Sequence, residues 1–489
     1  MRPISAASAL LLAYLVWGSR GWPLIHDAAL MHYVAWLITQ GAVPYRDVFD
    51  MNLPGVYLLH AAVLHVGGSG DLAWRLFDLA WLAATGALLW AYCRPLSYAA
   101  GAGAVLFGLF HLSGGAWRAG QRDFLLCLFL LAGAYGVARG LELPAGRLAL
   151  FAGGVALGAG MTVKPHAGLF WLLCAAVAAG AAWRAGRSAW RPAALVLAGG
   201  LLVPALVFGW LAGRGGLAPF QAVLTGYVLP LYSQVGRTSA LGAVRWHAWG
   251  RGLLALLAGL GVLGVLGTPR PWSPRLVLAS LGALYGAAHF ALQGKGWEYQ
   301  LYPLALFLCA LASAALAPDR TRPPAPGRGR VRRRLALVAW AGLVLVLGAK
   351  GVEAREPDWI AEKTRRVGAI TRDLAPLVPP GATVQVLDTT SGGIHALLRL
   401  GLRQPTRFIY DFHFFHHVGD PQIRALRAEL VAGLEARRPA AVVVLEESWP
   451  ELGYGRVATF PELAQLLERS FTLAATGPGY RIHAQRSDS

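Results

Sequence analysis

The chain has 489 residues, of which 56% are hydrophobic and only 14% are charged, and its formal net charge is +19. A mean hydropathy of +0.48 excludes an ordinary soluble protein of this length. Apolar runs recur through residue 350, and charged residues return after residue 355. We therefore expect a mostly α-helical, polytopic membrane domain over 1–350 and a soluble domain over 351–489.

The chain begins with Arg2 and an apolar run from Ala6 to Trp17. No convincing small-residue cleavage site follows this run, so it is predicted to be a signal anchor rather than a cleaved signal peptide. The four cysteines lie within or at the ends of apolar segments. Their spacing gives neither a disulfide framework nor a metal site.

The segment that follows the first apolar run is rich in carboxylates. Loop 20–70 contains Asp27, Asp47 and Asp50, and its apolar spacing predicts an amphipathic helix over 28–40. The apolar stretch 54–66 is short and begins with proline, which favours an interfacial helix. Ionisable groups at a membrane surface are costly, so they are functional or carefully solvated.

About eleven apolar segments are predicted to span the membrane, since a helix crosses a bilayer with roughly 20 residues. These segments lie near 3–19, 71–92, 97–113, 122–138, 148–163, 166–183, 193–212, 252–268, 276–292, 299–317 and 335–350.

Arginines set the expected orientation. With a cytoplasmic N-terminus, nearly all short arginine-rich loops, including 318–334, lie inside, as the positive-inside rule requires. Loop 20–70 and everything after residue 350 are then extracytoplasmic. The net positive charge is a topology signal, and no nucleic-acid partner is expected, because 318–334 has no interleaved aromatic residues.

Several cations lie in turns on the predicted outer face, where the positive-inside rule gives no reason for them. All four lysines of the chain are there. Two of them, Lys164 and Lys295, join Arg118 and Arg122 in turns between spans. Such cations could hold a lipid phosphate while a carboxylate acts as base. The alternative is that they reach lipid headgroups from interfacial positions.

The acidic and histidine residues also have simpler explanations. Asp27 could be the N-cap of the 28–40 helix, and Asp47 and Asp50 could close turns. His26 beside Asp27 is weak evidence for a metal ligand. The histidines of segment 413–417 are explained equally well by aromatic packing, and no metal site is expected.

Three motifs form a recognisable pattern. Asp27 opens the loop, and a G-x-x-P-Y-R-D segment (41–47) leads to Pro54. A Lys-Pro turn (164–165) and a K-x-x-E-Y-x-x-x-P segment (295–303) follow. This pattern resembles GT-C glycosyltransferases, specifically the family of protein O-mannosyltransferases and the lipid A aminoarabinose transferase. Many relatives have Asp-Glu where this chain has Asp27-Ala28, so a role of that second acid does not carry over.

The resemblance implies an enzyme of the cytoplasmic (inner) membrane that transfers a sugar from a polyprenyl phosphate to a lipid, glycan or protein acceptor on the outer face. Asp27 would deprotonate the acceptor, and the configuration at the sugar would be inverted. Neither a cofactor nor a metal is implied. The donor phosphate would contact Lys164, Lys295, Arg118 and Arg122. Other substrate contacts would come from Tyr45, Arg46, Asp47, Asp50, His166, Glu298 and Tyr299.

The soluble domain reads as alternating elements, which predicts a small α/β layer that covers the site or binds acceptor. Strands are expected at 382–389, 406–412 and 440–447, helices at 393–401, 421–437 and 460–469, and a hairpin at 471–485.

Other functions stay open at this point. A flippase for lipid-linked sugars would be expected to show internal repeats and polar groups at mid-membrane, and neither is visible. A glycan ligase or polymerase would place its large loop mid-chain. A catalytically silent scaffold with the same fold is the third alternative.

Overall fold

A computed structural model describes residues 2–97, 99–239, 242, 248–268, 271–317, 328–355, 358–449 and 453–486. Residues 318–327, the larger part of the predicted arginine-rich loop, lie outside the described residues, as does Arg270. The chain forms two compact units. Unit 1 comprises residues 1–22, 75–207 and 237–355, and unit 2 comprises residues 23–74, 208–236 and 356–489.

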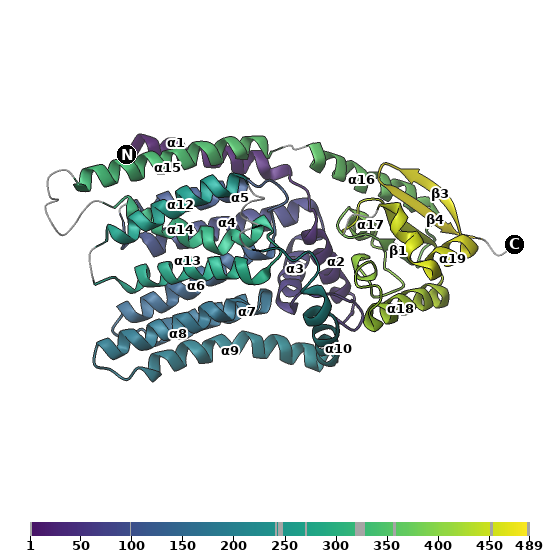
Figure 1. The fold of residues 1–489 in the computed structure, drawn as a ribbon, viewed down its shortest axis with the longest axis horizontal. Helices are drawn as coiled ribbons and strands as arrows, with labels where there is room; N and C mark the ends of the chain where they lie inside the picture. Colours follow the sequence, from purple (N-terminus) through teal and green to yellow (C-terminus); the bar gives the residue numbers. More distant parts are fainter. Residues whose placement is uncertain are drawn as a thin grey trace. The chain divides into compact units, whose positions relative to one another are not determined.

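Unit 1 is a bundle of helices that run roughly side by side (Figure 1). Its helices are α1 (Arg2–Gly18), α4 (Asp71–Cys93, from Arg75 onward), α5 (Ala100–Leu112), α6 (Arg122–Glu142), α7 (Arg147–Val163), α8 (Ala167–Arg184), α9 (Trp190–Gly213, up to Val207), α12 (Ala248–Leu266), α13 (Pro274–Gln293), α14 (Tyr302–Ala315) and α15 (Arg328–Glu353), with short turns η1 (Ser19–Gly21) and η3 (Glu298–Leu301). Helix α14 is buried along almost its whole length and packs against α5, α12 and α13, so it forms the centre of this unit.

Small residues allow the helices of unit 1 to pack closely. A Cβ atom added at Gly136 of α6 would lie 2.7 Å from the Cα atom of Gly153 in α7. No side chain fits between the two backbones at this point. Close approach of this kind is the usual way in which small residues join helices in a bilayer, where the hydrophobic effect drives no association.

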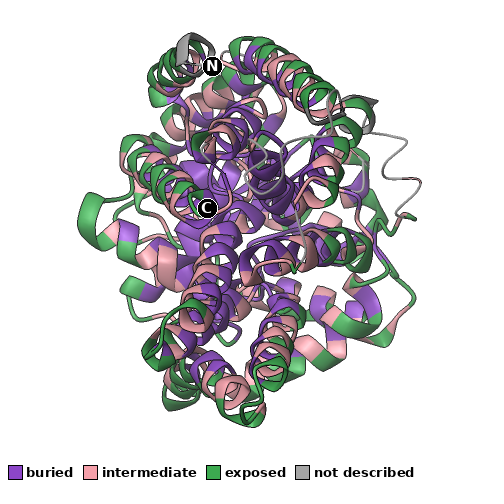
Figure 2. Ribbon diagram, turned by 90° about the vertical axis from the view of Figure 1, so that its left-hand side faces the viewer, coloured by how far each residue is buried: buried purple, intermediate pink, exposed green. Residues whose placement is uncertain are grey.

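Among the described residues, six helices are long and apolar enough to cross a membrane. They are α4, α6, α8, α9, α13 and the helical segment that contains α15. These helices present large apolar side chains outward, such as Leu284 (67% exposed) and Leu345 (70% exposed), and many of their outer faces are coloured as exposed in Figure 2. Exposed apolar faces of this kind suit lipid rather than water. Several other predicted spans coincide with shorter helices, and the total of about eleven stays a prediction.

Unit 2 combines the first loop with the C-terminal part of the chain. Its elements are α2 (Asp27–Thr39), α3 (Pro54–Gly67), α10 (Leu217–Val223), the π-helix η2 (Leu224–Tyr232), α16 (Asp358–Leu374), η4 (Ala375–Leu377), β1 (Val384–Leu387), α17 (Gly393–Leu400), η5 (Phe412–Phe414), α18 (Pro421–Arg437), β2 (Ala441–Leu445), η6 (Tyr454–Thr459), α19 (Pro461–Ser470), β3 (Phe471–Gly477) and β4 (Tyr480–Gln485).

The four strands form one mixed sheet in the order β1-β2-β4-β3. Strands β1 and β2 are parallel, and β4 runs antiparallel to both β2 and β3. The first two strands are buried throughout, as expected for valine-rich runs covered on both faces. The predicted strands at 382–389 and 440–447, the three helices and the terminal hairpin are confirmed.

The predicted strand at 406–412 is wrong. Within this stretch only Phe408 makes a β-bridge, and its partner is Phe49 of the first loop. The Phe49 amide donates to the Arg407 carbonyl at 2.7 Å. The backbone of this stretch therefore pairs with the first loop and does not join the four-stranded sheet.

Helix α2 also differs from its predicted one-sided pattern. Residues Ala28 to Ala35 are all buried, and the helix packs against α3 and α17 within unit 2. A helix that lies flat on a membrane would keep a polar face in water. Helix α2 is instead a core element of unit 2.

Candidate functional site

The candidate base Asp27 is the first residue of α2 and is half-buried. The N-cap residue of this helix is His26, and its side chain makes no capping hydrogen bond. The expectation that Asp27 serves as N-cap is therefore wrong. In the first turn of a helix, a carboxylate interacts favourably with the positive end of the helix dipole. Asp27 therefore lies one residue inside the helix rather than at its N-cap, at a position where a carboxylate is favoured.

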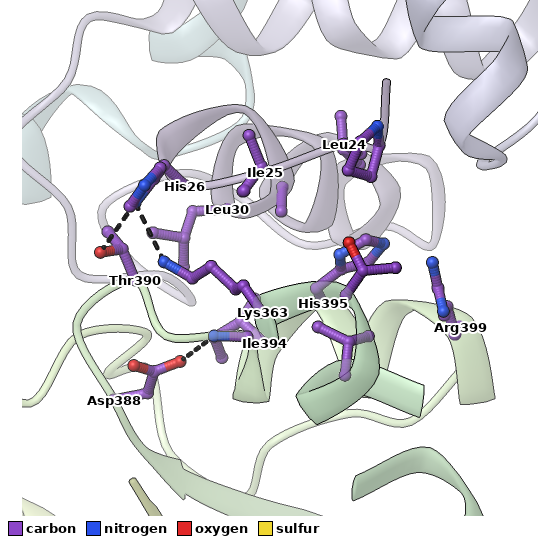
Figure 3. Close-up of a pocket in the computed structure, with 15 residues that line it drawn as sticks. Leu24, Ile25, His26, Leu30, Lys363, Asp388, Thr390, Ile394, His395 and Arg399 are labelled. Atoms are coloured by element: carbon purple, nitrogen blue, oxygen red, sulfur yellow. Dashed lines mark hydrogen bonds between the residues drawn. The ribbon is translucent and has the colours of Figure 1, made fainter. Parts of the chain in front are cut away.

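His26 joins the start of α2 to the C-terminal part of unit 2. Its Nδ1 atom lies 3.1 Å from the Lys363 ammonium and 3.2 Å from the Thr390 hydroxyl (Figure 3). Its ring packs against Trp359 at 5.4 Å between centroids. Burial, reinforced by the charge of Lys363, lowers the pKa of His26 well below its ordinary value, so the imidazole is neutral. A neutral Nδ1 that accepts from Lys363 is not available to a metal.

A small pocket opens beside this contact, within unit 2. Figure 3 shows His26, Lys363 and Thr390 grouped on one side of it and His395 and Arg399 on the other. Most of the remaining lining is apolar and comes from the chain before α2, from α2 itself and from α16 and α17.

The predicted substrate residues Tyr45 and Asp50 lie in a buried network that shapes the first loop. The Asp50 carboxylate accepts from the Tyr57 hydroxyl at 2.5 Å and from the Asn52 amide at 2.9 Å. The Tyr45 hydroxyl donates to the Asn52 carbonyl at 2.5 Å, and the Tyr45 backbone is left-handed, with φ 68°. These contacts hold the chain where α3 begins.

Asp50→Ala is expected to lower the stability of the protein rather than to act on chemistry alone. The change would leave the buried Tyr57 hydroxyl and the Asn52 amide without their acceptor, at a cost of about 1–3 kcal/mol for each such group. Thermal unfolding in detergent would measure the loss. An unchanged unfolding midpoint together with lost activity would instead indicate that Asp50 contacts the substrate.

Arg46 and Asp47 form an exposed turn. Their side chains make a two-point ion pair with distances of 2.8 and 2.9 Å, and the Asp47 carboxylate also accepts from the Val43 amide at 2.8 Å. The hydrogen bond from the Arg46 guanidinium, together with the Val43 amide and the charge of Arg46, lowers the pKa of Asp47. Exposed pairs of this kind contribute little stability, so the turn itself can serve as a surface for contacts.

In unit 1, the predicted cation Lys164 lies in a buried polar cluster. Its ammonium lies 3.1 Å from the Asp123 carboxylate and donates to the Gln293 side chain at 2.7 Å. The other Asp123 oxygen lies 2.6 Å from Nε2 of His289. Lys164 terminates α7, Asp123 stands in the first turn of α6, and the other two residues lie near the end of α13. Three helices therefore converge on one buried carboxylate.

Two further predicted residues, Arg118 and Glu298, form an ion pair beside η3. The Arg118 guanidinium lies 2.6 Å from the Glu298 carboxylate, and both side chains are buried. Arg118 also donates to the Phe110 carbonyl at 2.6 Å and stacks on the Phe110 ring. Tyr299, next to Glu298, packs against Trp117 at 5.9 Å between ring centroids. The structure thus brings Arg118, Glu298 and Tyr299 together.

The remaining predicted residues of unit 1 lie in or next to the same turns. Arg122 is the first residue of α6 and precedes Asp123. The His166 ring lies 5.5 Å from the His289 ring. Lys295 lies between Gly294 and Gly296, both with positive φ. Burial and the nearby Arg237 lower the pKa of Lys295 to about 8.

Asp123 and His289 were not among the residues predicted from the sequence. Both lie inside predicted spans, at 122–138 and 276–292, where an ionisable side chain is by itself a sign of function or of a buried partner. That signal could have found them. Their pairing with Lys164 could not be read from spacing, because the three residues come from different helices.

The histidines of segment 413–417 pack against aromatic residues. His413 and His416 lie 2.6 and 2.9 Å from the hydroxyl of Tyr227 in η2. Within the described part of the chain, no group of three or more His, Cys, Asp or Glu side chains is arranged to hold a metal ion.

No protein-family model and no curated protein matches the chain. Solved structures do match. The chain is similar to ArnT from Cupriavidus metallidurans bound to undecaprenyl phosphate, with a TM-score of 0.65 and 14% identity over 99% of this chain and 98% of ArnT. The apo state of the same protein gives a TM-score of 0.62 and 15% identity over 97% and 96% of the two chains.

A third structure is more distant. The archaeal oligosaccharyltransferase AglB from Archaeoglobus fulgidus, in complex with an inhibitory peptide and a dolichol-phosphate, has a TM-score of 0.50 and 12% identity over 99% of this chain and 74% of AglB. These proteins are GT-C glycosyltransferases. The resemblance predicted from the first loop is therefore confirmed at the level of architecture, and the chain has the GT-C fold over nearly its whole length.

Proposed function

We propose that the protein is a membrane glycosyltransferase that transfers a sugar from a polyprenyl phosphate to an acceptor on the outer face of the cytoplasmic membrane. The observation that carries this proposal is the likeness to ArnT, which extends over nearly all of both chains and includes a structure bound to undecaprenyl phosphate. The sugar and the acceptor are left open.

Asp27 is the proposed general base. Its carboxylate accepts the proton of the acceptor nucleophile as the nucleophile attacks the anomeric carbon. The bond between that carbon and the phosphate oxygen breaks in the same step, and polyprenyl phosphate leaves with the bonding electrons. A single displacement inverts the anomeric configuration. The position of Asp27 supports this role, because it lies half-buried in the first turn of α2 and interacts with the charge of Lys363.

The buried cations of unit 1 are the proposed donor-phosphate ligands. Lys164 and Arg118 are each held beside a carboxylate, Asp123 and Glu298 respectively. Such pairing fixes the position of a long cationic side chain before a ligand arrives, which is the condition for electrostatic stabilisation of a leaving phosphate. Arg122 and Lys295 are proposed to contribute from the adjoining turns.

The other predicted substrate contacts divide into two groups. His166, Glu298 and Tyr299 lie beside the proposed phosphate ligands and stay candidates for donor binding. The exposed turn of Arg46 and Asp47 is a candidate for acceptor contacts.

The orientation that this function requires is tested with reporter fusions. A periplasmic reporter enzyme fused after residue 400 is expected to be active, and the same reporter fused within 318–334 is expected to be inactive. The expectation follows from the arginine-rich loops. The reverse pattern would contradict an outer-face reaction.

The function is tested by the binding of undecaprenyl phosphate to the purified protein. A ligand that binds only the folded state stabilises it by about 2.7 kcal/mol at 100 times its Kd, so the lipid phosphate is expected to raise the unfolding midpoint in detergent. Undecaprenol, which lacks the phosphate, is the matched control. An equal shift with both lipids would argue for a site that recognises only the isoprenoid tail, as a nonspecific lipid groove would.

A further inference from the structure

Lys363 of α16 is a buried cation with only 5% of its surface exposed. Lysine is almost never fully buried unless it is paired. Its ammonium lies 3.1 Å from Nδ1 of His26, the residue directly before the proposed base. Nδ1 of His26 also lies 3.2 Å from the Thr390 hydroxyl. Two residues from the C-terminal part of unit 2 thus meet at one atom of the first loop.

The backbone at His26 needs such support. His26 has φ 50° and ψ −132°, in a region that side chains other than glycine rarely adopt. A residue in a sparsely populated conformation costs about 1–3 kcal/mol and persists only where its surroundings hold it in place. The direction in which Asp27 leaves the turn depends on this dihedral, because the two residues are adjacent in the chain.

The charges around Lys363 are mainly negative. Asp388 and Glu447 come from the C-terminal part of unit 2, Asp27 from α2, and Arg366 from α16 itself. His26 is the neutral partner on the remaining side. Asp388 is occupied in addition by the backbone amides of Ser391, Gly392 and Gly393 at the start of α17, at 2.7 to 3.0 Å. Lys363 therefore supplies a fixed positive charge in the neighbourhood of Asp27.

We infer that Lys363 is a positioning residue: by holding His26 in its positive-φ conformation and adding positive charge near Asp27, it sets the geometry of the proposed base. The C-terminal part of the chain would then complete the reaction centre rather than only cover it. This inference rests on the proposed function, since it assigns Lys363 a role through Asp27.

The first test compares three variants of the full-length protein. Lys363→Met removes the charge and keeps the length of the side chain, and it is expected to lower turnover about 10- to 100-fold with little change in KM for the donor, because a misplacement of about 1 Å costs up to roughly that factor. Lys363→Arg keeps the charge and is expected to recover most of the loss. Arg365→Met removes an exposed cation from the same helix and is expected to change nothing.

The second test uses pH and needs no destabilised variant. Burial lowers the pKa of Lys363 to about 8, while the nearby carboxylates favour its charged form and Arg366 opposes it. Lys363 is therefore charged below about pH 8 and loses its charge as the pH rises through that value. Hydrogen exchange of the peptide that covers the start of α2, corrected for the intrinsic rate, is expected to accelerate above pH 8 in the wild type. In Lys363→Arg, protection is expected to persist at pH 9.

The outcomes separate this inference from the proposed function. If Lys363→Met keeps full turnover, or if its loss is an increase in KM alone, Lys363 does not position the base. An exchange profile that is identical in the wild type and in Lys363→Arg would also overturn the inference. A wild type that transfers no sugar would contradict the proposed function, while the exchange experiment would still report whether Lys363 holds the start of α2.

Discussion

Asp27→Asn is expected to abolish most sugar transfer while the protein still folds and binds the donor. Asn is nearly the same size as Asp but cannot accept the proton of the acceptor. Loss of a general base costs about 10²–10⁴-fold in rate. The loss of stability is expected to be small, since Asp27 is not the N-cap residue of α2 and a carboxylate in the first turn contributes about 0.3–1 kcal/mol through the helix dipole.

The measurement is turnover by the purified variant, with undecaprenyl phosphate binding and the unfolding midpoint as parallel readouts. Asp358→Asn is the matched control, because it makes the same chemical change at the exposed first residue of another helix, α16, to which no role in the reaction is assigned. Near-normal transfer by Asp27→Asn would place the base elsewhere. If Asp27→Asn fails to fold, the role of Asp27 is to stabilise the folded protein rather than to act as the base.

Lys164→Ala is expected to weaken both donor binding and the folded state. The change removes a proposed phosphate ligand and also leaves the buried Asp123 carboxylate without the ammonium at 3.1 Å. Removing one partner of a buried ion pair typically costs about 3–5 kcal/mol, and His289 offsets part of this cost through its contact with the same carboxylate. Detergent unfolding and undecaprenyl phosphate binding measure the two effects separately.

A double variant separates the two roles of Lys164. Lys164→Met combined with Asp123→Asn removes both charges at once and keeps the approximate side-chain volumes, so the stability lost in the single variant is expected to return. Donor binding is expected to stay weak if Lys164 holds the phosphate. Recovery of donor binding as well would show that Lys164 only neutralises Asp123. In Lys164→Arg, donor binding is expected to stay well below that of the wild type, because a planar guanidinium does not replace a compact ammonium.

Local patterns predicted much of the secondary structure. The valine-rich runs gave β1 and β2, and the apolar spacing after Asp27 gave α2 to within a residue at each end. The failures occurred where a segment found its partner far away in the chain. The stretch at 406–412 has the composition of a strand, yet its backbone pairs with Phe49, more than 350 residues earlier. Helix α2 has an amphipathic spacing, yet α3 and α17 bury it on several sides.

The candidate site likewise combines residues that local sequence patterns predict with contacts that only the fold creates. Lys164 and Lys295 stood out in the sequence because lysine is rare and their turns face outward in the predicted orientation. Asp123 does not stand out in the sequence, because it directly follows Arg122 at the start of an apolar run. Only the packing of three helices shows that it pairs with Lys164. Lys363 is one of the four lysines on the predicted outer face, but its contact with His26 joins residues 337 positions apart.

The most direct test of the account compares envelope glycans by mass spectrometry in cells that carry the wild-type gene, no gene, or the Asp27→Asn variant. The account predicts one glycan modification, a single added sugar on a defined acceptor, that is present with the wild type and missing in the other two strains while the variant protein accumulates normally in the membrane. The same modification at wild-type levels in the Asp27→Asn strain, or no glycan difference between the wild-type and gene-deleted cells, would contradict it.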